Sequence, residues 1–125
     1  CGNTEWSILI DAGVDIVNFD AFGYGDTIAM YGDHVKMHLE KGGMLAWGVV
    51  PTSKEIREQT VESLQSHFEE IMDNLASKGI SKDLITEQAI ITPSCGTGSM
   101  EPEDAEKVFD MILSLTKAMK AKYNY

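Results

Sequence analysis

The chain has 125 residues, and its 20 acidic against 10 basic side chains give it a formal net charge of −10. This length suits one domain with a sizeable core, and no linker or low-complexity segment divides it. A surface so acidic, without a basic cluster, repels phosphate groups, so we expect neither nucleic acid nor a membrane as a partner.

The chain is expected to begin with a short helix followed by a strand. Asn3 or Thr4 is suited to cap that helix, because both side chains accept hydrogen bonds from the first backbone N–H groups. Residues 14–22 (VDIVNFDAF) predict a strand, since β-branched and aromatic residues dominate them. Period two places Asn18 and Asp20 on one face of this strand, and this face is therefore not simply core.

The middle of the chain predicts a helix, a buried strand and a long helix. The first helix covers about residues 26–41. Residues 44–50 (MLAWGVV) are continuously apolar between Gly43 and Pro51, which is typical of a strand buried on both faces of a parallel sheet. Apolar residues at helical spacing then predict a helix over about residues 53–78.

The last part of the chain predicts a strand, a glycine-rich turn and a final helix. Residues 80–88 read as a polar connection. The apolar residues 89–92 form the third strand and lead to Cys95. Pro102 suits the first position of a helix that continues to the end of the sequence.

These elements predict an α/β fold with three parallel strands and four helices. Three strands cannot close a barrel, and the very apolar strand edges would be exposed in a small open sheet. We therefore interpret residues 1–125 as a single partial domain: the C-terminal βα units of a TIM (β/α)8 barrel, whose N-terminal strands are absent. A small open sheet is the alternative.

Cys1, Asp20 and Cys95 are predicted to lie at one edge of the sheet. Cys1 precedes the first helix, Asp20 ends the first strand and Cys95 follows the last, and parallel strands bring such positions together. Two thiolates and one carboxylate are suitable ligands for Zn²⁺. The alternative is that both cysteines are buried in the core and that Asp20 caps a helix or turn.

The two cysteines also indicate a cellular compartment. They lie far apart in a sequence without a secretory signal or a long apolar segment, which favours a cytoplasmic protein. In a reducing cytosol we expect no disulfide between them. His34, His38 and His67 fall within predicted helices and are interpreted as surface residues.

Three phrases of the sequence resemble a known superfamily: CGNT at the start, VDIVNFDAF, and ITPSCGTGSM near residue 95. They are similar to the C-terminal part of the UROD/MetE-like superfamily, which joins cobalamin-independent methionine synthases, methyltransferases acting on coenzyme M, and uroporphyrinogen decarboxylases. The similarity covers essentially the whole chain, with the phrases in the same order.

The resemblance implies zinc as cofactor, with Cys1, Asp20 and Cys95 as ligands. Members that methylate thiols add a histidine two positions before the first cysteine, which would precede residue 1 here. Methionine synthases have Glu where this chain has Asp20, and Asp-x-His where it has Gly48-Val49-Val50. Transfer to or from a thiol other than that of methionine synthesis is therefore the expected chemistry.

On this resemblance the parent protein is a zinc-dependent methyltransferase, in which the metal activates a thiolate. Its partners are a small-molecule thiol, a methyl donor and the missing N-terminal part of the barrel or another chain. Asn18 or Thr97 is expected to orient a ligand or contact the substrate. The isolated chain is expected to be inactive, because half of the pocket is missing.

Two alternatives of different kinds stay open at this point. One is a metal-free enzyme similar to uroporphyrinogen decarboxylase, which has no use for both cysteines. The other is a non-catalytic half-barrel that docks with a partner chain.

Overall fold

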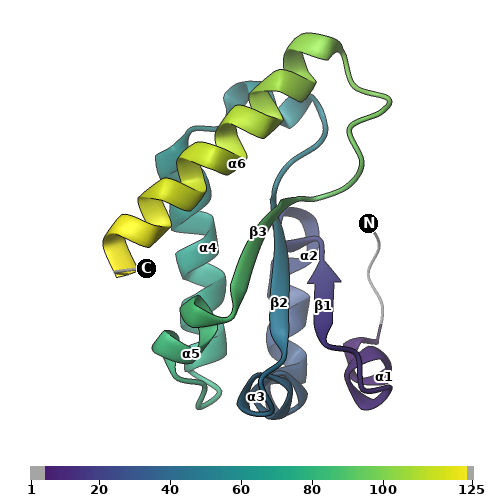
Figure 1. Ribbon diagram of the computed structural model, residues 1–125, viewed down its shortest axis with the longest axis vertical. Helices are drawn as coiled ribbons and strands as arrows, with labels where there is room; N and C mark the ends of the chain where they lie inside the picture. The colour runs from purple at the N-terminus through teal and green to yellow at the C-terminus, as the bar shows by residue number, and fades with distance from the viewer. Residues whose placement is uncertain (1–4, 124–125) are drawn as a thin grey trace.

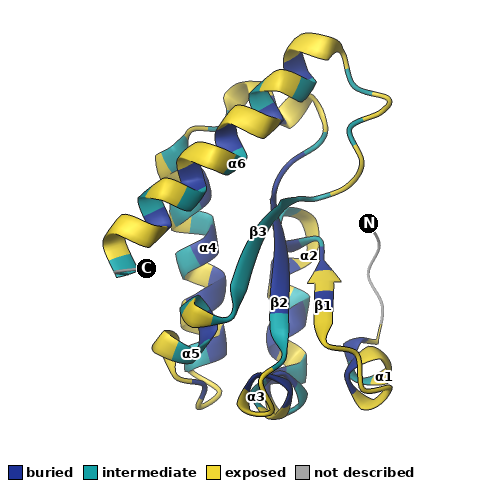
Figure 2. Ribbon diagram, viewed as in Figure 1, coloured by how far each residue is buried: buried dark blue, intermediate teal, exposed yellow. Residues whose placement is uncertain are grey.

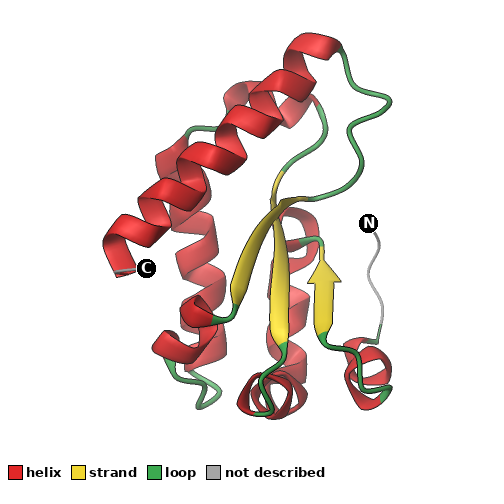
Figure 3. Cartoon of the chain, viewed as in Figure 1, coloured by secondary structure: helices red, strands yellow, loops and turns green. Residues whose placement is uncertain are grey.

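The computed structural model describes residues 5–123, which form an α/β structure around one parallel sheet with strand order β1-β2-β3 (Figures 1 and 3). This confirms the expected three parallel strands. In chain order the elements are α1 (Trp6–Asp11), β1 (Ile16–Phe19), α2 (Ala21–Ile28), the 3-10 helix η1 (Ala29–Tyr31), α3 (Gly32–Glu40), β2 (Met44–Val50), the 3-10 helix η2 (Lys54–Glu58), α4 (Val61–Ala76), α5 (Lys82–Glu87), β3 (Ala89–Pro93) and α6 (Pro102–Tyr123).

The central strand β2 is the most buried of the three, as its apolar sequence predicts (Figure 2). Its Trp47 is fully buried between two other rings. The ring centroids lie 5.2 Å from Phe19 of β1 and 4.1 Å from Phe68 of α4. This aromatic stack joins the sheet to the helical layer, and it lies in the same apolar cluster as the buried side chains of α6.

The first strand is shorter than its sequence indicated. β1 ends at Phe19, and residues 21 and 22 already belong to α2. The reason is local: Asp20 has extended backbone angles, and its carboxylate accepts a hydrogen bond from the Gly23 N–H, so it begins a helix instead of continuing the strand.

The expected number of four helices is wrong. Residues 5–123 contain six α-helices and two 3-10 helices. The segment expected as one helix over about 53–78 is divided, because Thr60 and Ser63 form a reciprocal capping box that starts α4. The polar connection is also partly helical, as α5 shows.

Helix α2 lies behind the sheet in the view of Figure 1, and α4 lies to the side of β3. The outer strands are less buried than β2 (Figure 2). Ile16 of β1 is 49% exposed. Along the segment that includes β3, the Gln88 carbonyl accepts from Leu45 N–H and the Ser94 N–H donates to the Val50 carbonyl. Backbone groups of even-numbered residues there face β2, and those of odd-numbered residues face the outer edge.

Two further expectations concern histidines and membranes. His38 is buried, so its interpretation as a surface residue is wrong: its Nε2–H donates to the Met44 carbonyl at 3.0 Å, and its ring fills the space beside Gly43. No helix within the described ranges combines the length and apolar character that crossing a bilayer requires.

Candidate functional site

The candidate site lies at the carboxyl edge of the sheet, where the three parallel strands end. Asp20 directly follows β1, and Cys95 comes two residues after β3. In Figure 1 this is the upper end of the sheet, from which the loop between β3 and α6 extends. Both residues therefore lie at the carboxyl edge, where the strand order predicts them.

Asp20 combines a structural role with an available oxygen. Its Oδ1 atom accepts the Gly23 N–H at 2.8 Å as the N-cap of α2. The residue is half-buried. An N-cap needs only one carboxylate oxygen, so capping and metal binding are compatible in this residue.

Ser94 fixes the position of the turn that carries Cys95. Its N–H donates to the Val50 carbonyl at 2.8 Å, and its Oγ accepts from the Thr52 N–H at 3.2 Å. The hydroxyls of Ser94 and Thr52 also lie 3.2 Å apart. These contacts attach the residue before Cys95 to the exit of the central strand.

Gly48 is the point where the two outer strands converge. A Cβ placed on Gly48 would lie 2.8 Å from the carbonyl oxygen of Phe19 and 2.9 Å from the Cα of Ser94. These two atoms belong to the residues that precede Asp20 and Cys95. The missing side chain therefore lets the backbone before each candidate ligand approach the same point of β2.

The state of Cys95 differs from the expectation based on the sequence. Cys95 is exposed, and it is disulfide-bonded in the structure, contrary to our expectation of reduced thiols. Cys1 lies outside the described residues. Among residues 5–123 no three His, Cys, Asp or Glu side chains are grouped to hold a metal ion. The carboxylate of Asp20 and a reduced Cys95 fit zinc by their chemistry, but they are only two donors.

The two residues expected to orient a ligand are accessible. Asn18 is exposed on β1, and Thr97 is half-buried in the turn after Cys95. A further polar group lies nearby: Thr92, paired with Gly48, has a buried Oγ1 without a hydrogen-bond partner in the described part of the chain. The sequence did not indicate a functional role for Thr92, because it appears there only as a residue of an apolar strand.

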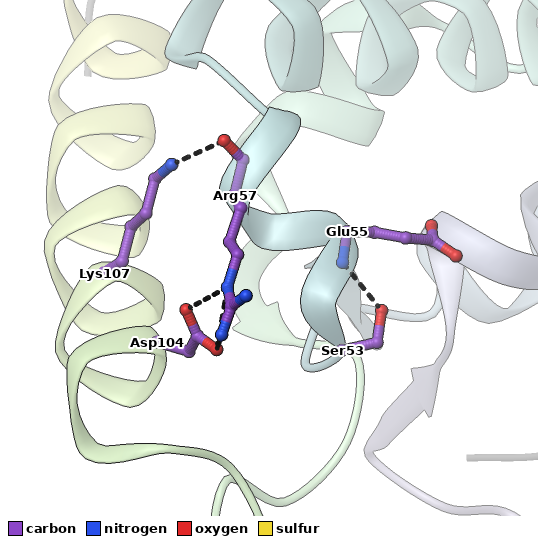
Figure 4. Close-up of polar contacts among 5 residues, drawn as sticks. All are labelled: Ser53, Glu55, Arg57, Asp104 and Lys107. Carbon is purple, nitrogen blue, oxygen red and sulfur yellow. Dashed lines mark hydrogen bonds and ion pairs between the residues drawn. The ribbon is translucent and has the colours of Figure 1, made fainter.

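An ion pair fixes the start of α6 at the same edge (Figure 4). Arg57 of η2 binds Asp104 of α6 through two nitrogens, with Nε–Oδ1 at 2.9 Å and Nη2–Oδ2 at 2.8 Å. Lys107 donates to the Arg57 carbonyl at 3.1 Å. Asp104 is buried, so its carboxylate depends on this bidentate partner. The pair joins the segment after β2 to the helix after β3.

This ion pair predicts acid sensitivity. Hydrogen bonds from Arg57 hold the pKa of Asp104 below its ordinary value and outweigh burial, which acts in the opposite direction. The stabilisation is therefore complete above the unfolded carboxyl pKa of about 3.9, and it is lost as pH falls through the folded pKa. Arg57→Met should lower the melting temperature clearly at pH 7 and much less near pH 2.

The matched control for this measurement is Lys36→Met, because Lys36 forms an exposed pair with Glu40 at 4.0 Å. It should change the melting temperature little at either pH. A difference between Arg57→Met and wild type that stayed constant from pH 7 to pH 2 would contradict the assigned role of Asp104.

Two cavities differ in their relation to this edge. One of about 190 Å³ lies beside it, and a larger one of about 350 Å³ lies away from it, along the outer edge of β3. The smaller one is connected to the candidate site through Thr52, which lines it and hydrogen-bonds to Ser94, the residue before Cys95. The smaller cavity is lined by Thr52, Ser53, Lys54, Ser99, Met100, Glu101 and Asp104.

The sequence left several residues of this site unrecognised. Gly48 had a usable signal, since a glycine inside an apolar strand often marks a close backbone approach. Ser94 and Arg57 had no such signal, because their partners Thr52 and Asp104 are more than 40 positions away.

Comparisons of the chain with protein-family models, curated proteins and solved structures found no match.

Proposed function

We propose that the chain supplies the C-terminal βα units of a (β/α)8 barrel and that its parent protein transfers a methyl group to or from a thiol in a zinc-dependent reaction. The observation that carries this proposal is the convergence of β1 and β3 at Gly48, just before Asp20 and Cys95. Barrel enzymes place their catalytic groups at this carboxyl edge. The resemblance of the three sequence phrases to UROD/MetE-like proteins supports the same reaction class.

In this proposal Asp20, Cys95 and Cys1 hold the metal. Bound zinc would remove the proton of a substrate thiol and keep the sulfur as a nucleophilic thiolate at neutral pH. Asp20 would contribute its oxygen from the start of α2, a position fixed by the Gly23 N–H. Cys95 would contribute its sulfur after reduction, from a turn that Ser94 holds against β2.

The proposed reaction also requires the site to hold a small thiol and a methyl donor in line with each other. The cavity beside the edge contains the hydroxyl-bearing Thr52, Ser53 and Ser99 and the cation of Lys54. These groups suit the polar part of a small thiol substrate. Asn18 and Thr97 keep their predicted roles in orienting a ligand or the substrate.

Zinc binding is the first test, and Asp20→Asn is the decisive variant. Asparagine caps a helix as well as aspartate does, so the variant keeps the Gly23 hydrogen bond and removes the negative ligand. The full chain is titrated with Zn²⁺ against a chromophoric chelator, in a non-thiol reductant because Cys95 is disulfide-bonded. We expect about tenfold or greater loss of affinity in Asp20→Asn and in Cys95→Ser.

The matched control is Asp26→Asn, which changes an exposed carboxylate of the same helix. It should bind zinc as the wild type does. Equal zinc affinity in wild type, Asp20→Asn and Cys95→Ser would refute the proposed ligands. A folded wild type that binds no zinc after reduction would instead favour the metal-free, decarboxylase-like enzyme.

A second candidate function is docking of this chain, as a half-barrel, with further βα units. The open edge of β3 favours it, because odd-numbered backbone groups face outward beside the cavity of about 350 Å³. Sedimentation of the purified chain distinguishes the cases, since a well-folded monomer at high concentration would contradict docking through this edge.

A further inference from the structure

His67 makes a specific polar contact, although it is neither a proposed zinc ligand nor part of the apolar core. It lies on α4, is half-buried, and its Nε2 atom lies 3.1 Å from the carbonyl oxygen of Ala21. Its ring also packs against Phe22, with centroids 5.8 Å apart. A carbonyl only accepts hydrogen bonds, so Nε2 carries the hydrogen. Both contacted residues directly follow Asp20 in the chain.

The first turn of α2 is not continuous with the rest of the helix. Tyr24 interrupts the regular helix with φ −131° and ψ 22°, so the turn that contains Asp20 and Gly23 is separated by a kink from the rest of α2. Beyond the kink, Gly25 packs so closely on Ile71 of α4 that a Cβ would lie 2.2 Å from its Cδ1 atom. Helix α4 therefore contacts α2 on both sides of the irregularity.

We infer that His67 is a positioning residue: it holds the first turn of α2 and so fixes the direction of the Asp20 carboxylate. The hydrogen bond acts on Ala21, and the ring contact acts on Phe22. Together they restrain the two residues after Asp20. The consequence for metal binding rests on the proposed function, whereas the restraint of the turn does not.

The test uses two substitutions with opposite expectations. His67→Phe keeps an aromatic ring against Phe22 and removes the donor. His67→Gln removes the ring and keeps an amide N–H donor at a similar distance along the side chain. The metal-free readout is hydrogen exchange of the Gly23 amide, which donates to Asp20. The Ser63 amide is the internal control, because it donates to the N-cap Thr60 on α4.

In His67→Phe we expect the Gly23 amide to exchange about five- to tenfold faster, as for the loss of one hydrogen bond, with the Ser63 amide unchanged. His67→Gln should restore most of the protection. Zinc affinity should fall about tenfold in His67→Phe. His34→Phe changes a half-buried histidine on α3, away from the first turn of α2, and should change neither quantity.

Unchanged Gly23 exchange in His67→Phe, or equal acceleration at Gly23 and Ser63, would overturn the positioning role whatever the metal does. Wild-type protein that binds no zinc would refute the proposed function alone, and the Gly23 measurement would still decide the role of His67. Faster Gly23 exchange with unchanged zinc affinity would support the restraint of the turn and overturn its proposed consequence for metal binding.

Discussion

Gly48→Ala is expected to destabilise the protein and to disrupt the candidate site together. The added methyl group would lie under 3 Å from the Phe19 carbonyl oxygen and the Ser94 Cα, and 3.1 Å from the Pro93 carbonyl oxygen. All three atoms are backbone, so no rotamer change relieves the collision and the strand ends must separate. We expect a loss of roughly 1–3 kcal/mol in the free energy of unfolding.

Urea unfolding measures this loss, and zinc titration of the reduced protein measures its effect on the site. Gly96→Ala and Gly98→Ala are the matched controls, because a Cβ on either glycine meets nothing within 4 Å. Each should change stability by about 0.5 kcal/mol or less. A Gly48→Ala protein as stable as these controls would show that the strands do not converge as described.

Phe68→Ala should cause the largest loss of stability, about 3–5 kcal/mol. Phe68 is 1% exposed, and its ring centroid lies 4.1 Å from that of Trp47. Its removal leaves a hole between α4 and the central strand. Small domains have a total free energy of unfolding of only about 5–15 kcal/mol, so the variant should reach its unfolding midpoint at a low urea concentration.

Phe109→Ala is the matched control for this variant, since it truncates the same residue type on a helix where the side chain is 54% exposed. It should change the free energy of unfolding by about 0.5 kcal/mol or less. Circular dichroism during urea titration gives both values. Similar losses in Phe68→Ala and Phe109→Ala would contradict the aromatic stack as the main joint between sheet and helices.

The sequence predicted the sheet well because its signals are local. The apolar run of β2 lies between Gly43 and Pro51, and the structure has β2 at the predicted residues 44–50. Helix boundaries were predicted less well, since they depend on single caps. The sequence predicts a strand that runs through Asp20, whereas the Asp20 carboxylate accepts the Gly23 N–H and begins α2.

The candidate site was predicted only as far as strand ends could indicate it. Asp20 and Cys95 were placed at one edge because each follows a parallel strand. The contacts that hold them, such as His67 with Ala21 and Ser94 with Thr52, join residues more than 40 positions apart and have no sequence periodicity. Cys1 lies outside the described residues, so its role as a ligand remains a prediction.

Pro93 has a consequence for how the outer edge of β3 accepts a neighbour. Its nitrogen faces that edge, because the adjacent Ser94 N–H faces β2. Proline has no N–H, so a strand added beside β3 finds donors at Ala89 and Ile91 but none at Pro93. The hydrogen-bond ladder to an added strand therefore loses its donor at Pro93, two residues before Cys95, so the turn that carries Cys95 lies beyond the paired segment.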